Sequence, residues 1–317
     1  MTDLLATVVS ATFFFAVVRT TVPILLAALG GLFADLSGAL NVALEGAMLA
    51  GALAAVIASS FFPWWTGLLA GVAVGAAIGA LMSLFHLRFG ADVVLVGFAV
   101  NLMAAGGTVF VLAQATGGDR GSSLALPSQS IPRLELPWLE AIPAVGPALA
   151  AALSGHSYLT WFALALVPLS WGFLYRTSTG LRLRAVGEYA PAAAAAGISA
   201  DRLRTLGLVL SGALAALGGV QLAMFNYIGF TRDMTAGRGF IALGAVLLGA
   251  RRPLGTAVAA LLFGAFEALA VTLPALYAGI PGELIHTIPF AVTVIALVVY
   301  ARRAQLLVRR QAAGVPS

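Results

Sequence analysis

Long apolar runs follow one another along most of this chain, and they constrain its fold more than any other feature. A helix needs about 20 apolar residues to cross the roughly 30 Å of hydrocarbon in a membrane. Of the 317 residues, 61% are hydrophobic and only 9% are charged, whereas a soluble domain carries about a quarter charged residues. The sequence therefore predicts an all-α polytopic membrane protein, with residues 1–317 forming a single transmembrane domain.

The lengths of these runs predict about 8–10 transmembrane helices. The run 236–250 is barely long enough to span, and a short or broken span is tolerated only where protein or a water-filled cavity satisfies its backbone groups. The first run contains Arg19 and Pro23, so it forms either one tilted, kinked span or two shorter pieces. The nine runs cover residues 7–33, 38–60, 65–87, 92–114, 157–175, 204–224, 236–250, 254–274 and 284–301.

The positive charges predict the orientation of the chain. All 17 basic residues are arginines, and basic residues are enriched in cytoplasmic loops. Arginines that fall at alternate ends of the runs place 176–204 and the tail 302–317 in the cytoplasm and 115–156 outside, with the N-terminus outside and the C-terminus inside. These arginines are Arg88, Arg176, Arg182, Arg184, Arg202, Arg204, Arg251, Arg252, Arg302, Arg303, Arg309 and Arg310.

The composition also excludes several functions. Without lysine, the chain has no phosphate-binding Gly-x-x-x-x-Gly-Lys-[Ser/Thr] loop, so any ATP hydrolysis belongs to another polypeptide. The absence of cysteine excludes disulfides and thiolate metal sites, and three scattered histidines predict no metal cluster. The net charge of +5 comes mostly from loop arginines, which indicates membrane topology rather than nucleic-acid binding.

Several polar residues stand inside the apolar runs. Asn41 and Glu45 are four residues apart, so a helix would place both on one face. A carboxylate within a membrane is costly unless it faces protein or a watery cavity. These two residues, like Asn101 and Glu267, either line a transport path or hydrogen-bond neighbouring helices. Further path candidates end the sixth run, where aromatic rings could instead form an interfacial belt. They are Gln221, Phe225, Asn226 and Tyr227.

The cytoplasmic segment 180–199 contains a predicted short helix. Pro191 suits the first helical position, the alanines that follow propagate a helix, and Gly197 suits the left-handed residue that ends it. A helix of about two turns is too short to span a membrane. It is either a docking element for a cytoplasmic partner or an inert connector.

Five motifs occur in order along most of residues 33–300: Leu40–Met48, Arg184–Ile198, Leu210–Gly219, Gly237–Gly249 and Pro253–Gly255. Together they resemble the inner-membrane permeases of bacterial ABC importers, in the ribose and nucleoside branch, and within it the nucleoside permeases that work with lipoprotein receptors. The resemblance implies a multi-pass permease of the bacterial plasma (inner) membrane that imports nucleosides by alternating access. A simple-sugar permease of the ribose type is the alternative.

The resemblance also implies partners. These are a second permease subunit, favoured as a different chain, two cytoplasmic ATP-binding subunits and an extracytoplasmic substrate-binding lipoprotein. The partner subunits would use ATP, while this chain would bind no cofactor and would not be an enzyme. ATP drives the switch between outward-open and inward-open packings only if it favours one of them.

Carried onto this sequence, the coupling helix that rests on the ATPase falls within 180–199. Family members usually carry a charged or polar residue where this chain has five alanines, so we expect fewer polar contacts there and a more apolar groove in the partner. The expected coupling residues are Arg184, Gly187, Glu188, Tyr189, Ala190, Pro191, Ala192, Ala193, Ala194, Ala195, Ala196 and Gly197.

Other classes remain open from the residues alone. An ion-coupled secondary transporter would be equally apolar, and Glu45 and Glu267 could carry its protons. A channel and a purely structural subunit are two more. Neighbouring genes for an ATPase, a second permease and a binding lipoprotein would favour the importer. The segment 115–156 is either a receptor-docking surface or a lid over the bundle.

Overall fold

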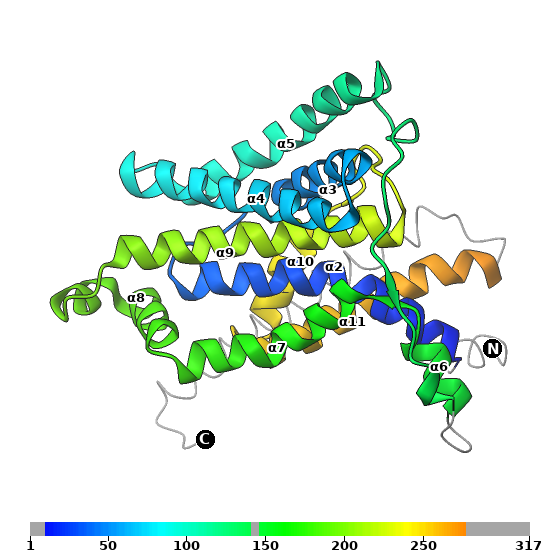
Figure 1. The fold of residues 1–317 in the computed structure, drawn as a ribbon. Helices are drawn as coiled ribbons and strands as arrows, with labels where there is room; N and C mark the ends of the chain where they lie inside the picture. The colour runs from blue at the N-terminus through cyan, green and yellow to red at the C-terminus, as the bar shows by residue number, and fades with distance from the viewer. Residues whose placement is uncertain (1–9, 141–145, 277–317) are drawn as a thin grey trace.

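The computed structural model describes residues 10–140 and 146–276, and almost all of its regular structure is helical (Figure 1). Two short strands, β1 and β2, pair antiparallel and bring Arg133 opposite Ser157. The elements are α2 (Ala11–Leu36), α3 (Leu44–Phe61), α4 (Trp64–Ser83), η1 (Leu84–Arg88), α5 (Val93–Thr116), β1 (Arg133–Leu134), η2 (Pro137–Leu139), α6 (Gly146–Leu153), β2 (His156–Ser157), α7 (Tyr158–Arg176), α8 (Ser178–Ala195), α9 (Ala200–Gln221), η3 (Leu222–Asn226), α10 (Arg238–Leu248) and α11 (Pro253–Leu276).

The helix boundaries follow local chemistry. At the start of α5, the Asp92 side chain accepts the N–H groups of Val94 and Leu95 at 2.9 and 3.0 Å. These are donors that a helix cannot satisfy within itself. The same helix ends at Gly117, whose φ of +75° lies in the left-handed region that glycine adopts without strain.

Seven helices in the described ranges are long and apolar enough to cross a membrane, which confirms seven of the nine predicted runs. Helix α2 continues through Pro23, so the alternative of two shorter pieces is wrong. Helix α10 has 11 residues, about 16 Å at 1.5 Å per residue, which confirms that the run 236–250 is short. The ninth run, 284–301, lies outside the described residues.

The second run starts later as a helix than predicted. Gly38, with a φ of +79°, ends α2, and α3 begins only at Leu44. We call the intervening stretch, residues 37–43, the α2–α3 connection. It includes Asn41, whose side chain accepts the N–H of Ala43 at 2.9 Å. Such a local bond competes with helix formation, which explains the late start.

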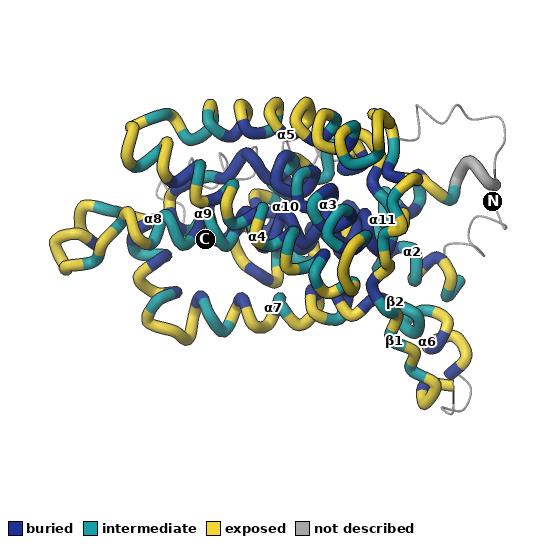
Figure 2. Tube along the Cα trace, turned by 45° about the horizontal axis from the view of Figure 1, so that its top comes forward, coloured by how far each residue is buried: buried dark blue, intermediate teal, exposed yellow. Residues whose placement is uncertain are grey.

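The centre of the bundle is formed by α2, α3 and α9, while α4, α5 and α7 bury a third or less of the residues in their apolar windows (Figure 2). Glycines allow the central helices to approach closely. A Cβ atom on Gly75 would overlap the backbone of Gly212, and one on Gly219 would overlap the backbone of Met48. Gly71, Gly75 and Gly79, four residues apart on α4, therefore form a packing face against α9.

The two polar ends of the protein lie far apart. Helix α8 lies beyond one end of the long helices, and α6, with the segment that leads into it from α5, lies at the other (Figure 1). The segments 176–204 and 115–156 thus lie at opposite ends of the bundle, and the assignment of the first to the cytoplasm and of the second to the outside stays a prediction.

Thiol labelling can test these assignments because the chain contains no cysteine. We expect an impermeant thiol reagent, added to intact cells, to label Ser128→Cys and to spare Ser178→Cys. Both variants should react in permeabilised cells, which serves as the control. External labelling of Ser178→Cys would refute the orientation.

Candidate translocation site

Glu45 caps the N-terminus of α10. Its two carboxylate oxygens accept the N–H groups of Gly237 at 2.8 Å and Gly239 at 2.6 Å. The N-cap residue of α10, Gly237, has no side chain of its own to do this, and a Cβ on Gly239 would overlap the backbone of Glu45. The positive end of a helix dipole favours an anion. Glu45 therefore supplies from α3 the cap that α10 lacks.

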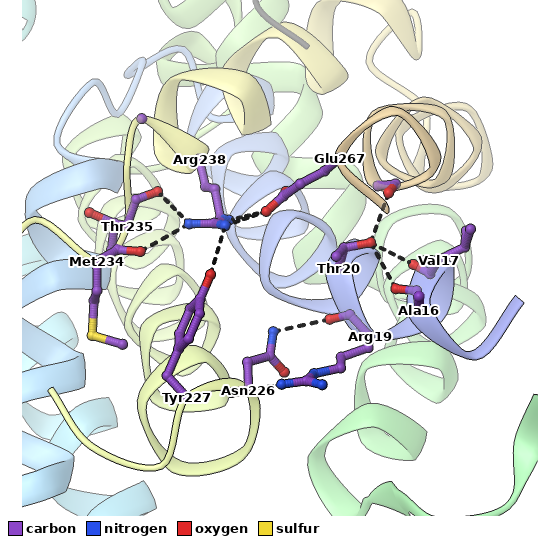
Figure 3. A network of polar contacts seen from close by, with 12 residues as sticks. Ala16, Val17, Arg19, Thr20, Asn226, Tyr227, Met234, Thr235, Arg238 and Glu267 are labelled. Atoms are coloured by element: carbon purple, nitrogen blue, oxygen red, sulfur yellow. Dashed lines mark hydrogen bonds and ion pairs between the residues drawn. The ribbon is translucent and has the colours of Figure 1, made fainter. Parts of the chain in front are cut away.

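Beside this cap, Arg238 forms a buried ion pair with Glu267 (Figure 3). The Arg238 Nε donates to Glu267 Oε1 at 2.8 Å, and the two side chains are only 11% and 13% exposed. The same guanidinium donates to the Tyr227 hydroxyl at 3.3 Å and to the carbonyls of Met234 and Thr235. One arginine thus ties α10 to α11 and to the loop before it.

Asn226, the last residue of η3, joins η3 to α2 a short distance away (Figure 3). Pro23 has no N–H, so the carbonyl of Arg19 one turn earlier loses its helical partner. The Asn226 Nδ2 donates to that carbonyl at 3.3 Å, and the Arg19 guanidinium donates in return to the Asn226 carbonyl. The proline in α2 is therefore tolerated because Asn226 of η3 replaces the missing bond.

Three buried oxygens around this network have no hydrogen-bond partner among the described residues: Asn226 Oδ1, Thr235 Oγ1 and Glu267 Oε2. Buried polar atoms in folded proteins are nearly always paired. The described residues contain no group of three potential metal ligands. In this conformation the three oxygens are hydrogen-bond acceptors that the described residues leave unpaired.

Asn41 and Asn101 form hydrogen bonds to neighbouring helices, one of the two roles predicted for them. Asn41 Nδ2 donates to Ser211 Oγ at 2.9 Å. Asn101 Oδ1 accepts the Gly46 N–H at 2.8 Å, and its Nδ2 donates to the Val42 carbonyl at 3.0 Å. The placement of Asn41 on one helix face with Glu45 is wrong, because α3 begins after Asn41. Both asparagines fasten the α2–α3 connection to neighbouring helices.

Gln221 and Phe225 contact residues outside the cluster at the start of α10. The fully buried Gln221 accepts from Ser157 Oγ at 2.9 Å and donates to Thr160 Oγ1 at 3.1 Å, which ties α9 to the start of α7. Phe225 is buried, with the Arg133 guanidinium 5.8 Å from its ring centroid. This burial does not fit an interfacial belt. The structure thus gathers Glu45, Asn226, Tyr227 and Glu267 near the start of α10 and leaves the other four outside.

The predicted coupling segment is more helical than expected. Helix α8 spans Ser178–Ala195 and bends at Tyr189, whose φ and ψ are −155° and 92°. The short helix after the bend is confirmed, and Gly197 has the left-handed φ of +76° that its position predicted. The prediction of a single short helix was incomplete, because the residues from Ser178 to the bend are helical as well.

The tip of α8, from Tyr189 to Gly197, is exposed except for Ala190, which is half-buried, and Ala193, which is buried. Arg184 lies away from this tip, because its guanidinium stacks on Tyr175 at 4.4 Å and its Nε donates to the Leu174 carbonyl at 3.1 Å. Nearby, Arg251 makes two bonds of 2.6 Å to Asp35.

The described residues thus form a polytopic helical bundle in which the short helix α10 starts at a polar cluster largely shielded from solvent. The family model described as branched-chain amino acid transport system, permease component, matches residues 13–297. The chain belongs to this family. It is a permease component of an ABC importer and a multi-pass protein of the bacterial inner membrane.

Similar proteins cover almost the whole chain. The guanosine ABC transporter permease protein NupQ of Bacillus subtilis is 34% identical, over 99% of this chain and 97% of its own length. The nucleoside ABC transporter permease protein NupC of Lactococcus lactis is 32% identical, over 89% and 90%. TsgC13 of Haloferax volcanii, by name a glucose ABC transporter permease, is 31% identical, over 80% and 75%.

Proposed function

We propose that this permease imports nucleosides. The similarity to a guanosine permease along 99% of the chain carries the proposal, and a second nucleoside permease supports it. A simple sugar is the second candidate because TsgC13 is named for glucose. Vesicles that hold the whole complex should take up labelled guanosine, and excess unlabelled nucleoside should compete while ribose and glucose should not. Competition by the sugars alone would reverse the assignment.

The cargo path is proposed to pass the start of α10. Glu45, Asn226, Tyr227 and Glu267 lie there on three different parts of the chain. Hydroxyl and amine groups of a nucleoside are donors, and the unsatisfied oxygens of Asn226 and Glu267 are acceptors. Tyr227, which is 55% exposed, offers a ring on which a base can stack. Asn41, Asn101, Gln221 and Phe225 remain candidates only for supporting this path.

The chain is proposed to work with a different second permease, two ATP-binding subunits and an extracytoplasmic binding lipoprotein. It supplies no catalytic chemistry, and its partners use the ATP. We place the receptor-docking surface on residues 117–136 of the predicted segment 115–156. Backbone hydrogen bonds join this part to the loop before α10. Ser123 N–H donates to the Phe230 carbonyl, and Arg232 N–H donates to the Gly121 carbonyl, both at 2.8 Å. A receptor seated there would act close to the path.

The exposed tip of α8 is proposed to dock on the ATPase. Gly197→Val should weaken that docking, since a β-branched residue is strained at a φ of +76°. No atom lies within 4 Å of a Cβ at this position, so the change should leave the bundle folded. The measurement is co-purification of the ATPase with the permease. Unchanged co-purification together with unchanged transport would make the tip an inert connector.

A further inference from the structure

The α2–α3 connection and its two flanking carboxylates hold α10 at both of its ends. Just before the connection, Asp35 accepts two bonds from Arg251 in the turn that follows α10. Just after it, Glu45 caps the start of α10. These carboxylates therefore link α10 to the connection at both ends.

Helix α8 contacts the end of α2 and the α2–α3 connection at a pair of glycines, Gly187 and Gly38. A Cβ atom on Gly187 would overlap the carbonyl of Leu36 and stand 3.1 Å from the Gly38 nitrogen. A Cβ on Gly38 would stand 3.2 Å from the Gly187 Cα. The contact is thus between two backbones. No flexible side chain lies between them to absorb a displacement, so a shift of α8 here must move the connection or break the contact.

The α2–α3 connection can carry a displacement from its Gly38 end to the start of α3. Residues 39–42 belong to no helix or strand, and a few non-helical residues can change their φ/ψ angles in a movement that a helix resists. Its far end is fastened by Asn41 to Ser211 and by Asn101 to Val42. Three residues beyond Asn41 the chain enters α3 at Leu44, so the connection leads directly to Glu45.

We propose that Gly187 is a positioning residue that transmits movement of α8 through the α2–α3 connection to α10 and its polar cluster. This inference rests on the proposed function, in which α8 docks on the ATPase. Gly187 touches neither cargo nor ATP. Its role is to keep α8 and the connection moving together, so that ATP-driven movement at the cytoplasmic end reaches the start of α10.

The test uses Gly187→Ala in the complete complex, with Gly172→Ala on α7 as the matched control because no atom lies within 4 Å of a Cβ there. The added methyl group separates α8 from the connection. We expect the ATPase to co-purify and hydrolyse ATP, while the nucleoside transported per ATP falls about tenfold or more, equivalent to about 1.4 kcal/mol or more. A wild-type ratio in Gly187→Ala would overturn the inference.

A second experiment covers the case in which Gly187→Ala does not assemble. Leu36, the last residue of α2 before the connection, and Glu188 on α8 line one cavity of about 350 Å³, so Leu36→Cys and Glu188→Cys can be joined by a short thiol cross-linker. If the two elements move together, the cross-linked complex keeps its transport. Loss of transport on cross-linking would overturn the inference. Failure of the proposed function is distinct, since the wild-type chain would then fail to bind an ATPase.

Discussion

Replacing Glu267 with Gln should destabilise the protein by about 3–5 kcal/mol, because it leaves the Arg238 charge buried without its partner. The two side chains are 11% and 13% exposed. An amide oxygen can still accept one hydrogen bond from the guanidinium, but it carries no charge to offset the cost of burial. Unfolding of the purified chain in detergent, by heat or denaturant, measures the effect.

Two variants show whether the loss comes from the unpaired charge. Glu188→Gln removes a carboxylate from an exposed position and should change stability by less than about 0.5 kcal/mol. The double variant Arg238→Met, Glu267→Gln removes both charges and should recover most of the stability. If Glu267→Gln alone lowers the stability as little as Glu188→Gln does, that result would contradict a structural role for the ion pair.

The membrane fold could be predicted because lipid imposes a simple rule. Every backbone polar group must be satisfied within the span, so runs such as 92–114 have to form helices. The short α10 was predictable for the same reason, from the length of its run. The start of α3 was not. The Gly38 N–H donates to the Asp35 carbonyl and the Asn41 side chain accepts the Ala43 N–H, and these local bonds outweigh an apolar pattern that carries no information about them.

The site could be predicted only in part. Glu45 and Glu267 stood out because a carboxylate in an apolar run needs an explanation. Arg238, which holds the cluster together, was missed although a buried Glu267 requires a cation nearby. It is an arginine between two glycines, Gly237 and Gly239, at the start of a short run, and that position could have indicated a partner. The pairing of Asp35 with Arg251 depends on tertiary structure alone.

Replacing Glu45 with Gln should lower transport per assembled complex by roughly tenfold or more. A Gln side chain keeps one acceptor oxygen and turns an N–H₂ group toward the second backbone donor. One of the bonds to Gly237 and Gly239 is then lost, and leaving a buried N–H unsatisfied costs about 1–3 kcal/mol. The anion at the positive end of α10 disappears as well.

The transport measurement separates a path role for Glu45 from a purely structural one. Both carboxylate oxygens are bonded to α10 in this conformation, so cargo can reach them only when α10 moves away from α3 during the transport cycle. Uptake must be normalised to purified complex, with binding of cargo to the receptor checked separately and the exposed Glu135→Gln as the control. If Glu45→Gln lowers thermal stability but transports like the wild type per complex, Glu45 is a helix cap and lies off the path. Reduced uptake at full assembly and unchanged receptor binding is the result expected if the cargo, or the α10 movement that admits it, depends on this carboxylate.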